Sequence, residues 1–173
     1  MTRRRCVVDT NVLATANGAN EPAGLDCRVA CADALREIMV DGHLFLDRGD
    51  LILDEYLKAV GAGQPEPGGA FVKWVLQNLW APDRVTRVPI TPRPTGSGRT
   101  GFQELPDPPR GTRYDPADEK FLAVAAACPE HPPVLQAFDS KWWGWQDALK
   151  ASGVTLHFLC PGQIQAKYEE KFG

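Results

Sequence analysis

The chain has 173 residues, of which 43% are hydrophobic and 24% charged, and its formal net charge at pH 7 is -3. These values are typical of one globular domain, which we expect to cover residues 1–173. The slight negative charge argues against a general nucleic-acid coat, but it is compatible with a local basic surface.

No apolar run approaches the roughly 20 residues that a membrane-spanning helix needs. The basic start of the chain is interrupted by Asp9 before any signal-peptide core could form. We therefore expect a cytoplasmic protein with no membrane partner.

Hydrophobic periodicity and turn residues predict strands and helices that alternate along the chain. Strands are predicted over residues 6–8, 43–47, 133–138 and 154–160, and residues 84–90 are predicted to form a strand or an extended arm. Helices are predicted over residues 25–40, 50–60, 70–80, 116–128, 142–152 and 163–172, with a loop over 14–24. This alternation favours an α/β fold, a three-layer α/β/α sandwich with a mostly parallel central sheet.

Two of these helices carry an apolar stripe that we expect to face the core. The stripes consist of Leu25, Val29, Leu35, Ile38 and Met39 in the first helix, and of Phe71, Trp74, Val75, Leu79 and Trp80 in the helix over residues 70–80.

A long segment over residues 91–114 is rich in proline and glycine and is predicted to be a loop. Its Gly96–Gly101 stretch matches G-x-G-x-x-G, but no strand-turn-helix surrounds it, so a dinucleotide site is not expected. Arginines in the segment could form a basic arm that grips phosphates, or an ordinary solvated linker; these are Arg93, Arg99, Arg110 and Arg113.

The five cysteines are an odd number and include no Cys-x-x-Cys pair; they are Cys6, Cys27, Cys31, Cys128 and Cys160. We expect small buried thiols in a reducing compartment. The three histidines are scattered, so a zinc site is not expected.

Four acidic residues stand where a metal site could form. Asp9 and Asp139 follow predicted strands, and the C-terminal ends of parallel strands share one edge of a sheet. Glu55 lies beside the apolar stripe of one helix, although Asp54 could be the inward acid instead, and Asp118 lies in the first turn of another helix. Each acid alone could be a helix-terminal charge or cap, so the argument depends on the set.

The segments around these acids resemble the four acidic motifs of PIN-domain nucleases. They are Asp9-Thr10-Asn11 after two valines, Glu55 in Ile-Leu-Asp-Glu-Tyr, Asp118 in Asp-Pro-Ala-Asp-Glu-Lys-Phe-Leu-Ala-Val-Ala, and Asp139 in Gln-Ala-Phe-Asp-Ser-Lys-Trp-Trp. The resemblance implies a PIN fold with the four acids at one end of a parallel sheet. Two features depart from the small VapC-type toxins: the length of segment 91–114 and the tryptophans Trp142, Trp143 and Trp145.

The resemblance implies a metal-dependent endoribonuclease that leaves a 5′-phosphate. Carboxylates clustered without basic partners are expected to hold a hard divalent cation. Asp9, Asp118 and Asp139 would bind Mg²⁺ or Mn²⁺, Glu55 would complete the site or orient a water, and Thr10, Asn11 and Ser140 would support it. RNA is then the expected substrate. An antitoxin, another protein partner or a second copy of the chain are expected partners by resemblance only.

Two other interpretations stay open. A catalytically silent PIN module could bind nucleic acid or protein, although all four acids are present. A structure-specific DNA nuclease of related fold would need a clamp for branched DNA, which the sequence does not show.

Overall fold

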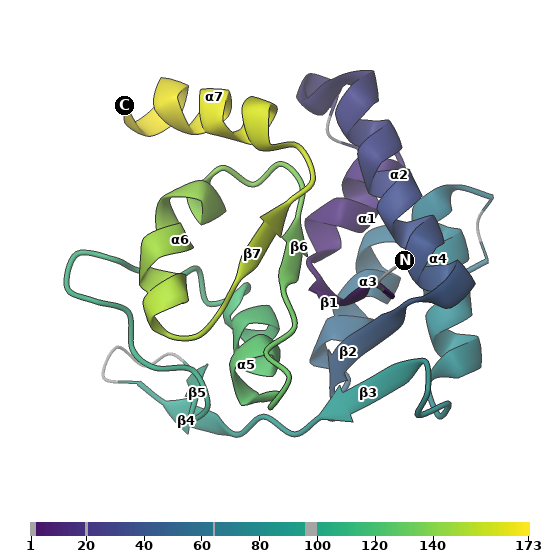
Figure 1. Ribbon diagram of the computed structural model, residues 1–173, viewed down its shortest axis with the longest axis horizontal. Helices are drawn as coiled ribbons and strands as arrows, with labels where there is room; N and C mark the ends of the chain where they lie inside the picture. The colour runs from purple at the N-terminus through teal and green to yellow at the C-terminus, as the bar shows by residue number, and fades with distance from the viewer. Residues whose placement is uncertain (1–2, 20, 64, 96–99) are drawn as a thin grey trace.

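The central sheet contains five parallel strands. The computed structural model describes residues 3–19, 21–63, 65–95 and 100–173. The strands are β1 (Arg5–Val8), β2 (His43–Asp47), β3 (Val85–Val88), β6 (Val134–Gln136) and β7 (Leu156–Phe158). They lie in the order β3-β2-β1-β6-β7, and each neighbouring pair is parallel (Figure 1).

Helices cover the sheet, so the expected α/β/α sandwich is confirmed (Figure 1). They are α1 (Thr10–Ala16), α2 (Gly24–Asp41), α3 (Leu51–Val60), α4 (Pro67–Asn78), α5 (Glu119–Ala127), α6 (Lys141–Ala151) and α7 (Pro161–Phe172), with a 3-10 turn over Glu21–Ala23.

The central strands are apolar because both of their faces are covered. Cys6, Val7 and Val8 of β1 have no exposed surface, and every residue of β2 is buried. Such continuous burial is typical of strands in parallel sheets. The one acid in β2, Asp47, can be buried because its carboxylate accepts hydrogen bonds from Leu51 N and Ile52 N at 2.8 Å each. The same two bonds cap the start of α3.

The sequence missed α1, whose last turn falls in the predicted loop over residues 14–24. This helix is short, and it begins because the Asp9 carboxylate accepts a hydrogen bond from Asn11 N at 3.0 Å. The helix predicted over residues 70–80 also begins earlier, at Pro67, since proline is well suited to a first helical turn.

The predicted stripe of α2 was partly wrong. Leu25 is 71% exposed and Val29 is 48% exposed, whereas Leu35 and Ile38 are buried as expected. The buried face is completed by smaller residues, Cys27, Cys31 and Ala34. Trp80 is also exposed, at 78%, because α4 ends at Asn78; the Arg87 guanidinium lies over its ring, 4.4 Å from the centroid.

Segment 91–114 is less open than a loop prediction implies. It contains a two-stranded antiparallel sheet of β4 (Pro92–Pro94) and β5 (Thr100–Phe102). Phe102, Leu105 and Tyr114 are buried in the core. Hydrophobic side chains therefore anchor the segment to the domain at three points.

The prediction of five free thiols was wrong for one pair. Cys27 of α2 and Cys160, the residue before α7, form a disulfide with a Cα–Cα distance of 5.4 Å. Cys6, Cys31 and Cys128 are free and buried, as expected. Spacing in the sequence could not reveal a pair separated by 133 residues, because only the fold brings α2 and the start of α7 together.

Among the described residues, no helix combines the length and the apolar character that a membrane crossing requires.

Candidate active site

The four predicted acids lie near the point where the order of the sheet reverses. After β1 the chain builds β2 and β3 on one side of β1, and it later returns to place β6 and β7 on the other side. Asp9 directly follows β1 and Asp139 lies three residues after β6. Ligands of open α/β sheets bind at such a switch point, outside the C-terminal ends of the strands.

Asp9 is fixed at this point by two hydrogen bonds. Its Oδ2 accepts from Asn11 N at 3.0 Å and from Gln136 Nε2 at 2.9 Å. Only 4% of its surface is exposed. Burial raises the pKa of Asp9 to about 7, and the nearby carboxylates of Glu55 and Asp139 add to the rise.

Gln136 connects Asp9 to the fourth acidic motif. Its side chain is fully buried, and its Oε1 accepts hydrogen bonds from Ala137 N at 2.8 Å and Asp139 N at 3.2 Å. The sequence analysis missed this residue, although a polar side chain at the end of a buried strand was an available signal. One amide therefore positions two of the four acids.

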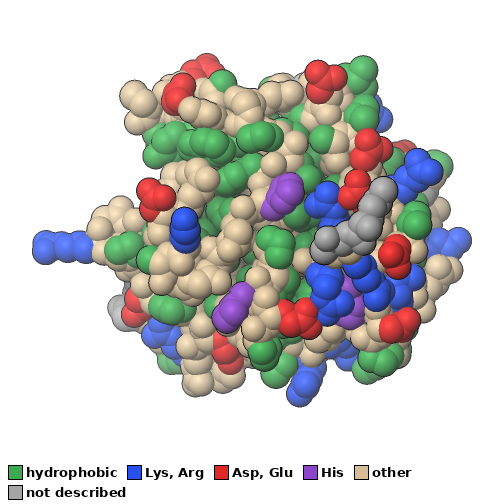
Figure 2. All heavy atoms as spheres, in the orientation of Figure 1, with side chains coloured by type: hydrophobic (Ala, Val, Ile, Leu, Met, Phe, Trp, Pro, Cys, Tyr) green, Lys and Arg blue, Asp and Glu red, His purple; other side chains and the backbone are tan. Residues whose placement is uncertain are grey.

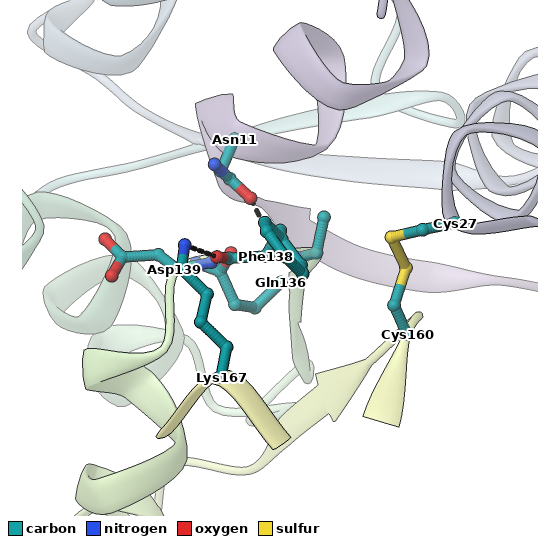
Figure 3. The surroundings of a disulfide bond; sticks show 8 residues. Asn11, Cys27, Gln136, Phe138, Asp139, Cys160 and Lys167 are labelled. Carbon is teal, nitrogen blue, oxygen red and sulfur yellow. Dashed lines mark hydrogen bonds between the residues drawn. A yellow bond between two sulfur atoms is a disulfide. The ribbon is translucent and has the colours of Figure 1, made fainter. Parts of the chain in front are cut away.

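Asn11, which was predicted to support the site, reinforces the same connection. Its Oδ1 accepts a hydrogen bond from Phe138 N at 2.6 Å, and on the other side of that residue Lys167 Nζ of α7 donates to Phe138 O at 2.9 Å (Figure 3). The backbone leading to Asp139 is thus held between α1 and α7.

Asp118 lies just before α5, which begins later than predicted, at Glu119. Its side chain makes no capping hydrogen bond, and its buried Oδ2 has no hydrogen-bond partner in the described part of the chain. Burial raises the pKa of Asp118 to about 8, with further contributions from Asp9 and Asp139. Asp118 stands at the N-terminus of α5 without a capping hydrogen bond from its side chain, so the alternative of an N-terminal helix charge stays open.

Glu55 of α3 points to the same region, whereas its neighbour Asp54 is exposed. Glu55 Oε2 accepts a short hydrogen bond from the hydroxyl of Thr10, the predicted supporting residue. Glu55 Oε1 accepts from Lys120 Nζ at 3.0 Å. Of the two acids that the sequence could not distinguish, the structure selects Glu55.

Two lysines and a fifth acid were not expected at the site. Lys141 Nζ lies 2.8 Å from Asp115 Oδ2 and 3.8 Å from Asp139 Oδ2. The expectation of carboxylates without basic partners was therefore wrong, because Lys120 and Lys141 partly neutralise Glu55 and Asp139. Lys141 also lowers the pKa of Asp115.

The four acids supply ligand atoms of the type that a hard divalent cation binds, but the described part of the chain does not bring three of them together. Carboxylate oxygens are the ligands that Mg²⁺ and Mn²⁺ prefer, and Mg²⁺ usually keeps several waters while binding one or two carboxylates. The Oδ2 of Asp118, which has no hydrogen-bond partner among the described residues, is an oxygen of this type. Among the described residues, however, no three acids bring ligand oxygens within 4.8 Å of one another; only Cys27, Cys31 and Cys160 form a group of that kind.

The remaining predicted residues have varied positions. Ser140 is buried at the start of α6 and makes no capping hydrogen bond through its side chain within the described residues. Arg93 pairs with Asp107 at 2.5 Å, so it is held within its own segment. Arg110 and Arg113 are exposed, and Arg99 lies outside the described residues.

The tryptophans after Asp139 serve mainly in packing. Trp142 is fully buried and Trp145 is 7% exposed; their ring centroids are 5.6 Å apart. Trp143 is half-buried against Phe158.

Comparisons with known proteins give no further identification. No family model matches the chain, and no curated protein or solved structure matches it either.

Proposed function

We propose that this protein is a metal-dependent endoribonuclease whose site is formed by Asp9, Glu55, Asp118 and Asp139. The observation that carries the proposal is the buried Asp118 Oδ2, which lacks a partner among the described residues while Asp9 and Asp139 raise the pKa of its carboxyl group. Buried polar atoms are nearly always satisfied, and a cation is the partner that would relieve this one. RNA as the substrate and a 5′-phosphate as the product come from the resemblance to PIN-domain nucleases.

Asp9, Asp118 and Asp139 would hold Mg²⁺ or Mn²⁺, directly or through water. When bound, the ion supplies Lewis-acid activation of water and neutralises charge on the phosphate. Gln136 and Asn11 keep Asp9 and the Asp139 backbone in fixed positions. Glu55, whose carboxylate accepts a hydrogen bond from Thr10, would orient a water. Lys141 would bind a substrate phosphate in place of its contacts with Asp115 and Asp139.

The test compares neighbouring acids in purified protein. We expect Asp118→Asn and Glu55→Gln to lower Mn²⁺-dependent cleavage of a labelled single-stranded RNA by about 100-fold or more, because ligand and positioning groups of a metal site act together. Asp54→Asn is the matched control, since Asp54 precedes Glu55 on α3 but is exposed. Undiminished cleavage by Asp118→Asn would contradict the site, and end mapping of the product tests for the 5′-phosphate.

A silent binding module is the second candidate. It is favoured by the two lysines that already pair with the acids and by the wide spacing of the carboxylates among the described residues. A Mn²⁺ titration separates the candidates: an increase in melting temperature at pH 8 is expected for the nuclease, and no change is expected for the silent module. The resemblance to PIN-domain nucleases also suggests a biological role, as a toxin, an RNA-processing enzyme or a defence enzyme. It further suggests an antitoxin or a second copy of the chain as partner.

A further inference from the structure

A pocket of about 400 Å³ opens beside the acidic site, between the segment before Asp115 and helices α6 and α7. Lys141 at the start of α6 and Arg113 line one part of it. Tyr168 and Phe172 of α7 and Trp145 of α6 line another part. The proposed cleavage chemistry uses none of these aromatic residues.

The two parts of the pocket suit the two parts of a nucleotide. Arg113 is exposed and Lys141 is half-exposed, so both cations are accessible to an anion such as a phosphate. The rings of Tyr168 and Phe172 have centroids 5.1 Å apart, and Phe172 is 57% exposed. An accessible aromatic surface beside cations is a typical stacking platform for single-stranded nucleic acid.

Gly144 of α6 leaves the space that the Tyr168 ring occupies. It lies within α6, where glycine costs about 1 kcal/mol relative to alanine. A Cβ at this position would lie 2.8 Å from Tyr168 Cε2 and 2.9 Å from its hydroxyl oxygen. Only glycine therefore lets the Tyr168 ring approach α6 as closely as it does.

Lys141 joins the pocket to the acidic site, because its ammonium also lies 2.8 Å from Asp115 Oδ2 and 3.8 Å from Asp139 Oδ2. A nucleotide whose phosphate contacts Lys141 would have its base in the aromatic part of the pocket and an adjoining phosphate toward the acids.

Basic side chains gather on one part of the face that Figure 2 shows. Another hollow of the protein is lined by Arg3, Arg4 and Arg36. Its Arg4 is paired with Glu37 at 2.7 Å, and Arg3 donates to backbone carbonyl oxygens. It lies at the opposite ends of the strands from the acids, so it is not part of the same site.

We propose that the pocket between α6 and α7 binds one nucleotide of a single-stranded RNA substrate, with the base against Tyr168 and Phe172 and the phosphate on Arg113 and Lys141. The inference deepens the proposed nuclease function and rests on it for the identity of the substrate. The binding itself requires no metal.

The experiment therefore measures binding in the presence of EDTA, where no cleavage occurs. Fluorescence of Trp145 and its neighbours is followed during titration with 5′-AMP, adenosine and inorganic phosphate. We expect 5′-AMP to bind at least 10-fold more tightly than either fragment, because only it reaches both parts of the pocket. Equal affinities for 5′-AMP and phosphate would overturn the proposal, as would equal affinities for 5′-AMP and adenosine.

Matched variants locate the binding. Arg113→Gln and Tyr168→Leu are expected to weaken 5′-AMP binding by about 10-fold, whereas Tyr168→Phe should keep it because the ring remains. Arg110→Gln is the control, since Arg110 is exposed nearby and does not line the pocket. Unchanged binding in both Arg113→Gln and Tyr168→Leu would overturn the pocket. The two tests are independent: loss of the pocket would not change the expected effect of Asp118→Asn on cleavage. Undiminished cleavage by Asp118→Asn would not change the expected binding of 5′-AMP.

Discussion

Asp118 shows at the scale of a single residue how burial and neighbouring acids keep a carboxyl group protonated. Its buried oxygen lacks a partner within the described chain, and Asp9 lies close enough to raise its pKa further. The pKa values of Asp9 and Asp118, about 7 and about 8, mean that both groups hold protons in the folded protein at mildly acidic pH. Each proton is what a divalent cation would displace.

These raised pKa values make the stability of the metal-free protein depend on pH. The folded pKa of each group lies above the ordinary aspartate value of 3.8, so the folded state binds more protons than the unfolded state between these values. The contribution of these two groups to the free energy of unfolding therefore falls as pH rises from about 4 to about 8.

We predict that Asp118→Asn removes part of this fall. At pH 8 the variant should be more stable than the wild type by about 1–2 kcal/mol, or a few degrees in melting temperature, because no carboxyl group at position 118 must lose its proton in a buried place. Melting curves in EDTA from pH 5 to pH 8 provide the measurement, with Asp147→Asn, an exposed acid on α6, as control. Parallel pH curves for Asp118→Asn and wild type would contradict the prediction.

The sequence located the acids better than it located their partners. Asp9 and Asp139 could be predicted because each follows an apolar strand, and the ends of parallel strands meet at one edge. The contacts of Gln136 with Asp9, of Lys120 with Glu55 and of Lys141 with Asp115 could not be assigned, because each joins residues that are distant along the chain. Such pairings depend on how the elements pack.

At the scale of elements, burial decided which predictions were accurate. β2 was predicted with its observed bounds because its apolar run is continuous and flanked by turn residues. α1 was missed because one capping side chain, Asp9, starts a helix too short to show a periodic pattern. The stripe of α2 was misread because cysteine and alanine, rather than Leu25 and Val29, fill its buried face.

The contact between α1 and α4 offers a test of this packing. Gly68 N donates to Asn17 Oδ1 at 2.7 Å, and a Cβ on Gly68 would lie 2.8 Å from that oxygen and 2.9 Å from Leu13 O. We predict that Gly68→Ala lowers the free energy of unfolding by about 1–3 kcal/mol, because a backbone oxygen cannot move aside as a flexible side chain can.

Denaturant titration measures the effect of Gly68→Ala. Gly162→Ala serves as control, because a Cβ added to Gly162 of α7 would meet no atom within 4 Å and its φ lies outside the left-handed region. The control should change stability little. Equal effects of the two substitutions would show that α1 and α4 do not pack as closely as described.

At the scale of the whole molecule, the reversal of strand order between β1 and β6 divides the sheet into two parts, and the candidate site lies where they meet. β1, β2 and β3 lie on one side with α1 to α4, and β6 and β7 lie on the other with α6 and α7. The hydrogen bonds of Gln136 to Asp9 and of Phe138 to Asn11 cross this division beside the acids. The Cys27–Cys160 disulfide crosses it too, and it fixes the start of α7 (Figure 3).

We predict that breaking this disulfide weakens the attachment of α7. A bond that joins residues 133 positions apart restricts the unfolded chain strongly, so the Cys27→Ser/Cys160→Ser double variant should lose about 2–5 kcal/mol of unfolding free energy. Hydrogen exchange in α7 should rise, and 5′-AMP should bind less tightly because Tyr168 lies on this helix.

Thiol chemistry supplies the controls for this prediction. Denatured wild-type protein should show three reactive thiols without reductant, from Cys6, Cys31 and Cys128, and two more after reduction. Reductant should destabilise the wild type to the level of the double variant and leave the double variant unchanged. If reductant changes neither protein, the disulfide does not hold α7, and the β1–β6 pairing together with the hydrogen bonds around Asp9 and Phe138 joins the two sides of the sheet without it.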